Sequence, residues 1–112
     1  FNTAIKLLTN QQPLELINKI NEIEKKLKKN KKIINGPRNI DLDIIFFGKQ
    51  KFNKKNLIIP HPRAAERDFV LYPILDIDPF FRHPLEKKSI KVLSKELQNK
   101  YIIKRLSYRN LI

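Results

Sequence analysis

The feature that most constrains the fold is an apolar repeat in the first third of the chain. Four aliphatic residues recur there at intervals of three and four positions: Leu16, Ile20, Ile23 and Leu27. This spacing places side chains on one face of an α-helix. Pro13 precedes the repeat and suits the first turn of a helix, where its missing N–H costs no hydrogen bond. The pattern predicts an amphipathic helix over residues 13–28 with one buried stripe.

The rest of the chain alternates between strand and helix patterns. Strands are predicted over residues 1–9, 39–47, 55–59 and 100–106, and helices over residues 67–76 and 89–98. Gly48-Lys49-Gln50 is predicted to be the turn of a hairpin that joins the second and third strands, and Asn35-Gly36-Pro37 an earlier turn. Strands interleaved with helices indicate an α+β fold, with helices on one face of a sheet. A length of 112 residues fits one domain.

The charge balance is strongly basic. Lysine and arginine total 24 against 11 acidic residues, which gives a formal charge of +13. Such an excess favours polyanions, either nucleic acid or nucleotide phosphates, although a codon bias toward Lys, Ile and Asn would produce it as well. The chain has no cysteine, which excludes disulfides and thiolate metal sites. Its apolar runs are too short to cross a bilayer.

A pair of aspartates marks the first candidate site. Asp41 and Asp43 are two residues apart, so in a strand both point to one face while the aliphatic residues around them face the core. Adjacent carboxylates repel unless a cation lies between them, and oxygen ligands suit Mg²⁺ that also binds phosphate. Arg38 precedes the pair and has a planar group that grips phosphate bidentately. The alternative is an exposed polar face on which Arg38 and nearby lysines pair with the aspartates.

A second basic segment follows. His61 stands between two prolines that restrict its backbone, so it could donate to a phosphate oxygen or assist proton transfer. Arg63 and Arg67 are four residues apart and would share one anion if this stretch is helical. Taken alone, a histidine that caps a turn beside solvated arginines is the simpler interpretation. By the same standard Phe69 is a core residue, and His83, which lacks such neighbours, is structural.

Two blocks read together resemble the hydroxymethyl dihydropterin pyrophosphokinases of folate biosynthesis. They are residues 36–44 (GPRNIDLDI) and 60–63 (PHPR), the latter followed by residues 67–71 (RDFVL). The resemblance implies a ferredoxin-like α+β sandwich with an antiparallel-rich sheet. It implies transfer of the pyrophosphoryl group of ATP to 6-hydroxymethyl-7,8-dihydropterin, with release of AMP. It also implies two Mg²⁺ ions, ATP as co-substrate, and a cytoplasmic protein, monomeric when complete, with neither membrane nor nucleic acid as partner.

The resemblance also assigns roles to single residues. Asp41 and Asp43 would bind the metal ions, and Glu24 matches a family glutamate on the preceding helix. Phe69 would stack on the pterin ring, whose polar edge Asn2 would bind. The catalytic set would be Arg38, His61 and Arg67, of which Arg67 stabilises the charge that develops during transfer. The ATP-binding set would contain these three residues together with Lys29, Lys31, Ile44 and Arg63.

Two departures from the family pattern stand out. The family usually has Gly-Arg-x-Arg in the loop after the first helix, where this chain has Lys28-Lys29-Asn30-Lys31, which keeps the charge but loses the bidentate fork. The family's first strand, ending in Gly-Ser-Asn, has no counterpart, and Phe1 stands where a methionine would start a chain. We therefore expect residues 1–112 to be a single, N-terminally truncated pyrophosphokinase domain. An inactive remnant of that enzyme and a basic nucleic-acid-binding module remain as alternatives.

Overall fold

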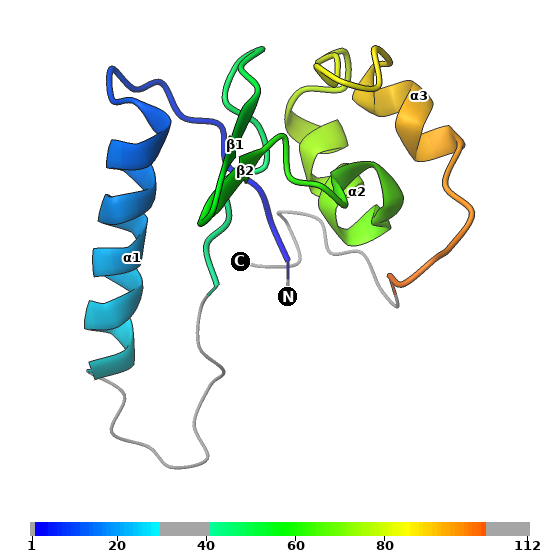
Figure 1. The fold of residues 1–112 in the computed structure, drawn as a ribbon. Coiled ribbons are helices and arrows are strands. Elements are labelled where there is room, and N and C mark those ends of the chain that lie inside the picture. Colours follow the sequence, from blue (N-terminus) through cyan, green and yellow to red (C-terminus); the bar gives the residue numbers. More distant parts are fainter. Residues whose placement is uncertain (1, 30–40, 103–112) are drawn as a thin grey trace. The chain divides into compact units, whose positions relative to one another are not determined.

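The computed structural model describes residues 2–29 and 41–102 (Figure 1). The elements in chain order are α1 (Pro13–Lys29), β1 (Phe52–Lys54), β2 (Leu57–Ile59), a short 3₁₀ helix (Ala64–Glu66), α2 (Asp68–Ile77) and α3 (Ile90–Lys95). The chain divides into two compact units, one formed by Leu8–His61 and the other by Phe1–Leu7 with Pro62–Ile112. Each unit is described by itself.

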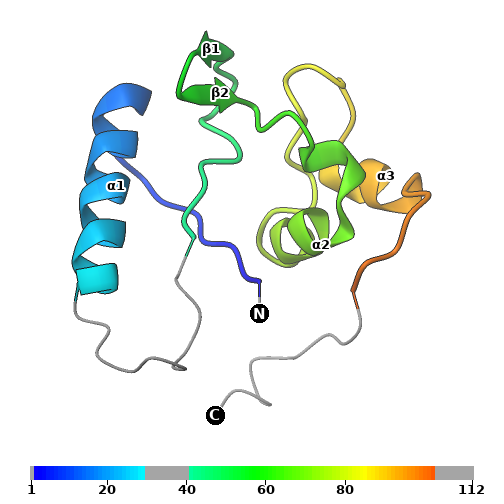
Figure 2. The same cartoon turned by 60° about the horizontal axis from the view of Figure 1, so that its bottom comes forward.

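In the Leu8–His61 unit, α1 lies beside the β1–β2 hairpin (Figures 1 and 2). The predicted helix is confirmed, with an end one residue beyond the predicted one. Its aliphatic residues Leu16, Ile17 and Ile20 pack against a small core. That core consists of Ile44, Leu57 and Ile59, with Phe47 and Phe52 at its edge. The predicted stripe is only half correct, because Ile23 and Leu27 lie beyond this core and are exposed.

The hairpin differs from the predicted one. β1 pairs with β2 in antiparallel fashion, with Phe52 opposite Ile59 and Lys54 opposite Leu57, and the chain turns at residues 55–56. β2 falls within the predicted strand over residues 55–59, and its alternate residues are buried and exposed as a half-buried strand requires. Its partner was missed because residues 52–54 are short and mostly polar, and carry no alternating apolar signal.

The predicted strand over residues 39–47 is wrong over its described part, residues 41–47, which belongs to no strand. Its predicted partner pairs with β1 instead, and its apolar residue Ile44 is buried against α1 rather than in a wider sheet. The turn that follows is confirmed. The Gln50 N–H donates to the Phe47 carbonyl oxygen at 3.0 Å, and Gly48 has a φ of 54°.

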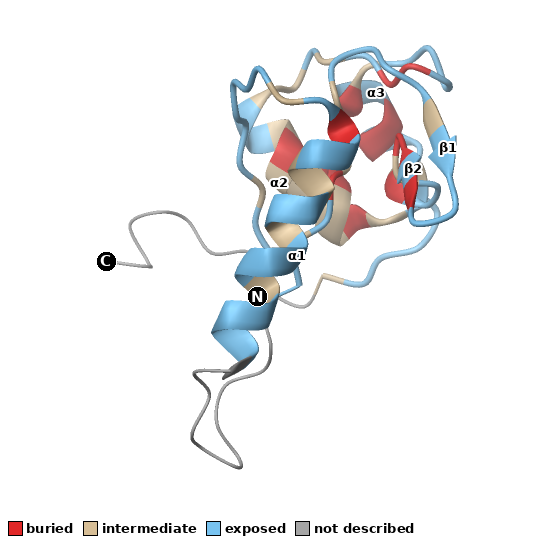
Figure 3. Ribbon diagram, turned by 60° about the vertical axis from the view of Figure 1, so that its left-hand side comes forward, coloured by how far each residue is buried: buried red, intermediate tan, exposed pale blue. Residues whose placement is uncertain are grey.

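In the second unit, α2 and α3 pack against each other. Their buried apolar residues are Leu71 and Ile74 from α2 and Ile90 and Leu93 from α3, and Figure 3 shows buried stretches of both helices in red. The helix predicted over residues 67–76 is confirmed within one residue at each end. The helix predicted over residues 89–98 is shorter, because Ser89 caps it and the Glu96 N–H closes it by bonding to two carbonyl oxygens.

The two terminal strands are not found. Residues 2–9 and 100–102 form no strand, and residues 103–106 of the second prediction lie outside the described residues. Within the described ranges the only sheet is β1–β2, and neither segment pairs with it. A two-stranded antiparallel sheet with three α-helices is compatible with the α+β class. No helix in residues 2–29 or 41–102 is long and apolar enough to cross a lipid bilayer.

Candidate functional site

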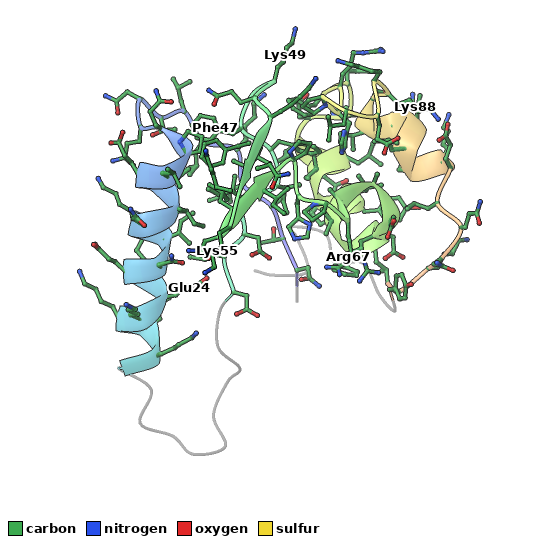
Figure 4. The ribbon with its side chains drawn as sticks, in the orientation of Figure 1. Glu24, Phe47, Lys49, Lys55, Arg67 and Lys88 are labelled. Atoms are coloured by element: carbon green, nitrogen blue, oxygen red, sulfur yellow. The ribbon has the colours of Figure 1, made fainter. Side chains whose placement is uncertain are left out.

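The aspartate pair lies on a segment that is hydrogen-bonded to α1. The Leu42 N–H, between Asp41 and Asp43, donates to Oε1 of Glu24 at 2.7 Å. Glu24 is half-buried and projects from α1 toward this segment (Figure 4). Both aspartates are exposed, whereas the next residue, Ile44, is buried in the core. The backbone is therefore held from two sides while the two carboxylates face solvent.

The two aspartates suit magnesium because their carboxylates supply oxygen ligands, although they do not form a complete set of metal ligands by themselves. Asp41 and Asp43 offer hard oxygen ligands, and Mg²⁺ commonly takes one or two carboxylates and completes its shell with water and phosphate. Among the described residues there is no cluster of three or more acidic, histidine or cysteine side chains that could hold a metal. Because residues 41–47 are not a strand, the predicted shared strand face is absent, and what the structure shows is the Leu42 backbone between the two aspartates hydrogen-bonded to Glu24.

The backbone of His61 is hydrogen-bonded to the segment that carries the aspartates. Its N–H donates to the carbonyl oxygen of Ile45 at 2.9 Å, which joins the end of the hairpin to the chain two residues after Asp43. The peptide bond between Ile59 and Pro60 is cis. The His61 side chain is half-buried. Within one unit, the fold therefore brings together the residue between the two prolines and the Asp-x-Asp segment.

The two arginines after His61 occupy different backbone environments. Arg63 is exposed and precedes the 3₁₀ helix, with its Nε 3.4 Å from Oε2 of Glu66. Arg67 is extended, with φ −114° and ψ 116°, and precedes α2 directly. The stretch from Arg63 to Arg67 is therefore not one continuous helix. The prediction that the two arginines share an anion required a helix here, and that requirement is not met.

Arg67 contacts Phe69 instead. Its guanidinium carbon lies 5.5 Å from the centroid of the Phe69 ring, a cation–π distance. Both residues are half-buried, Phe69 in the first turn of α2 and Arg67 directly before it, where Figure 4 labels it. The ring of Tyr101 meets the Phe69 ring at 77° with centroids 6.1 Å apart. No sequence pattern pointed to Tyr101 as a site residue, since it lies outside the recognised blocks and far along the chain.

For several predicted site residues the structure describes little or nothing of the side chain's surroundings. Asn2 is exposed in the N-terminal segment of the same unit as Phe69, and Lys6 of that segment pairs with Asp78 at 2.9 Å. Lys29 ends α1, but its side chain is not described. Lys31, Arg38 and the predicted turn at residues 35–37 lie outside the described residues.

His83 has the structural role expected of it. It is buried, and its Nδ1 accepts hydrogen bonds from the backbone N–H groups of Leu85 and Glu86, each at 3.1 Å. Burial lowers the pKa of His83, and the nearby Glu86 carboxylate opposes this shift only in part. An acceptor that serves two backbone donors must be unprotonated, so the neutral ring is the form that the fold requires.

The sequence matches one known protein family. The family described as 7,8-dihydro-6-hydroxymethylpterin-pyrophosphokinase (HPPK) matches residues 1–79. This match contains every site residue named above except Tyr101 and His83. It includes the aspartate pair in one unit and the Arg67–Phe69 contact in the other.

Curated relatives extend the similarity beyond residue 79. The chain is 47% identical over 90 residues to "Folic acid synthesis protein fol1" of Pneumocystis carinii, covering 80% of this chain and 12% of that protein. It is 41% identical over 105 residues to "Bifunctional protein FolKE" of Lactococcus lactis subsp. cremoris, covering 91% and 30%. It is 37% identical over 95 residues to "2-amino-4-hydroxy-6-hydroxymethyldihydropteridine pyrophosphokinase" of Aquifex aeolicus, covering 85% and 59%. The chain thus spans less than two thirds of the length of each of these relatives.

Proposed function

Because the chain belongs to the 7,8-dihydro-6-hydroxymethylpterin-pyrophosphokinase family, we propose that it functions in pyrophosphoryl transfer from ATP to 6-hydroxymethyl-7,8-dihydropterin. The hydroxyl oxygen of the pterin bonds to the β-phosphorus and its proton is released, while the bond from that phosphorus to the α-phosphate oxygen breaks and AMP leaves with that oxygen. The observation that carries the proposal is the Asp-x-Asp segment, anchored by Glu24 and lying beside the backbone of His61. The name of the Aquifex aeolicus relative, a pyrophosphokinase of the same pterin, supports this reaction.

The polyphosphate half of the site uses charge and position. Asp41 and Asp43 would hold Mg²⁺, which when bound neutralises and orients phosphate oxygens. Arg38, His61 and Arg67 bind the polyphosphate, and Arg67 offsets the charge that develops in transfer. Lys29, Lys31 and Arg63 add positive charge for ATP binding, and Ile44 adds a backbone contact. Ile44 contributes its backbone only, because its side chain is part of the core.

The pterin half of the site rests on Phe69. Its ring is half-buried, so it keeps surface on which a planar heterocycle can stack, and Asn2 binds the polar edge of that heterocycle. The Arg67–Phe69 contact at 5.5 Å supports the proposal, because a phosphate-binding group and a pterin platform must adjoin if the hydroxymethyl group is to reach the β-phosphorus. Catalysis then depends mainly on holding the two substrates in line.

The finer features implied by the family are part of the same proposal. They are a ferredoxin-like sandwich formed by a single domain, two Mg²⁺ ions, a monomeric state and a cytoplasmic location. An inactive remnant is the alternative that the lysine-for-arginine loop at residues 28–31 favours, since lysines lack the bidentate fork. A nucleic-acid-binding role is less compatible with two exposed carboxylates at the candidate site, because they would repel a phosphate backbone.

The test is a calorimetric titration with ATP, with and without magnesium. The wild-type chain should show saturable binding that requires magnesium, and Asp41→Asn/Asp43→Asn should abolish it. The matched control is Glu15→Gln/Glu22→Gln, which removes two exposed carboxylates from α1 in the same unit and should bind normally. Undiminished binding by the aspartate variant would refute the metal site. Detection of AMP formation from ATP and the pterin would dispose of the inactive remnant.

A further inference from the structure

Asp68 is a buried acidic residue that none of the proposed roles uses. It lies in the first turn of α2, between Arg67 and Phe69 in the sequence, and is 1% exposed. Its Oδ2 accepts hydrogen bonds from the backbone N–H of Tyr101 at 2.7 Å and of Ile102 at 3.0 Å. A single carboxylate oxygen therefore holds a segment that is 33 and 34 residues further along the chain.

The segment held in this way carries the ring that packs on Phe69. Because the Tyr101 N–H is bonded to Asp68, the Tyr101 ring stays near the first turn of α2, where it meets Phe69 at 77°. This near-perpendicular arrangement is one that aromatic pairs prefer, since the positive edge of one ring meets the negative face of the other. Phe69 is thus contacted by the Arg67 guanidinium and by the Tyr101 ring.

Holding the segment through a buried carboxylate also carries an energetic cost. The Oδ1 atom of Asp68 is buried and has no hydrogen-bond partner among the described residues. A buried carboxylate oxygen without a hydrogen-bond donor carries a desolvation penalty, and an apolar side chain at this position would not incur it. The two bonds at Oδ2 offset this penalty, because a carboxylate accepts hydrogen bonds more strongly than a neutral group does.

We propose that Asp68 and Tyr101 are positioning residues for pterin recognition. Asp68 fixes the backbone of Tyr101, and the Tyr101 ring holds Phe69 in the orientation that receives the pterin. A phenyl ring that is already oriented loses less conformational freedom when a ligand stacks on it, so the affinity for the ligand rises. This inference rests on the proposed function, in which Phe69 is the pterin platform.

The decisive comparison is Tyr101→Leu against Tyr101→Phe. Each variant is titrated with 6-hydroxymethyl-7,8-dihydropterin at saturating magnesium and a non-hydrolysable ATP analogue, and separately with the analogue alone. Tyr101→Leu should weaken pterin binding about 2- to 10-fold, the range expected for loss of one aromatic pair. Tyr101→Phe keeps the ring and should bind as wild type. Affinity for the ATP analogue should not change in either variant.

Hydrogen exchange tests the other link, from Asp68 to the Tyr101 backbone. In Asp68→Asn the amides of Tyr101 and Ile102 should exchange faster than in wild type, and pterin affinity should fall as it does in Tyr101→Leu. If Asp68→Asn does not fold, the two Tyr101 variants decide the matter. Equal pterin affinity in Tyr101→Leu and wild type, or a matching loss of ATP affinity, would overturn the inference while the proposed function stands. Failure of the wild type to bind pterin would overturn both.

Discussion

The hydrogen bond from Leu42 to Glu24 gives a prediction whose size follows from the structure. Glu24→Ala leaves the Leu42 N–H without its acceptor, in a half-buried position between the two aspartates. A hydrogen bond to a charged group contributes about 1.5–3 kcal/mol, and partial exposure of Glu24 points to the lower end of that range. We therefore expect the free energy of unfolding to fall by about 1.5 kcal/mol.

The same variant should weaken binding of magnesium and ATP. Once the tether is lost, the Asp-x-Asp segment must be ordered again when the ligand binds, and this cost is at most the energy of the lost bond. A cost of about 1.4 kcal/mol corresponds to a tenfold weaker affinity, so the dissociation constant should rise by up to about tenfold. Urea denaturation measures the first effect and calorimetric titration with ATP and magnesium measures the second.

Two control variants separate the tether from other effects. Glu24→Gln keeps an oxygen that can accept from the Leu42 N–H and should lose less than half as much stability and affinity. Glu22→Ala makes the same substitution at an exposed position of the same helix and should leave ATP binding unchanged. If Glu24→Ala loses stability but binds magnesium and ATP as tightly as wild type, the tether does not position the aspartates, and the reasoning is refuted.

Two further predictions concern the fold. Because burial lowers the pKa of His83 below its unfolded value of 6.5, its stabilising contribution is complete above that pH and is lost as the pH falls through the lowered folded-state pKa. Urea denaturation of His83→Asn, which does not titrate, should give a flatter profile between about pH 5 and 7, and an unchanged slope would contradict this. Gly48→Ala should cost about 1 kcal/mol through its φ of 54° alone, since no heavy atom beyond the two adjacent residues lies within 4 Å of the added Cβ. Gly48→Asn should cost less in the same assay, and a larger cost for Asn would argue against a purely conformational effect.

Local patterns predicted the helices well and the strands poorly. The repeat that contains Leu16 and Ile20 reports a helical face directly, because residues three and four apart are neighbours in any helix. A strand exists only with a partner, and the sequence does not show which partner forms. Residues 41–47, with their run of apolar side chains from Ile44 to Phe47, therefore resembled a strand. Ile44 instead packs against α1, while the mostly polar residues 52–54 form the ladder with β2.

The candidate site divides in the same way. Residues in compact blocks, such as Asp41, His61 and Phe69, were identified from the sequence because their order along the chain carries the family resemblance. Contacts between distant segments were not. Glu24 was noted only as a family match, and its bond to Leu42 spans 18 residues. Tyr101 lies in no recognised block, so only the folded chain reveals that it meets Phe69.

The uneven packing of α1 gives its two halves different local stabilities. The first half is covered by the core through Leu16, Ile17 and Ile20, so it opens only when that core opens. The second half, with Ile23 and Leu27 exposed, is held mainly by its own backbone ladder, which frays at little cost. Glu24 belongs to this second half, and each opening of these turns releases Leu42. The end of α1 and the Asp-x-Asp segment therefore form one cooperative unit. A ligand bound to the aspartates would favour the state of this unit in which the Glu24–Leu42 hydrogen bond is formed.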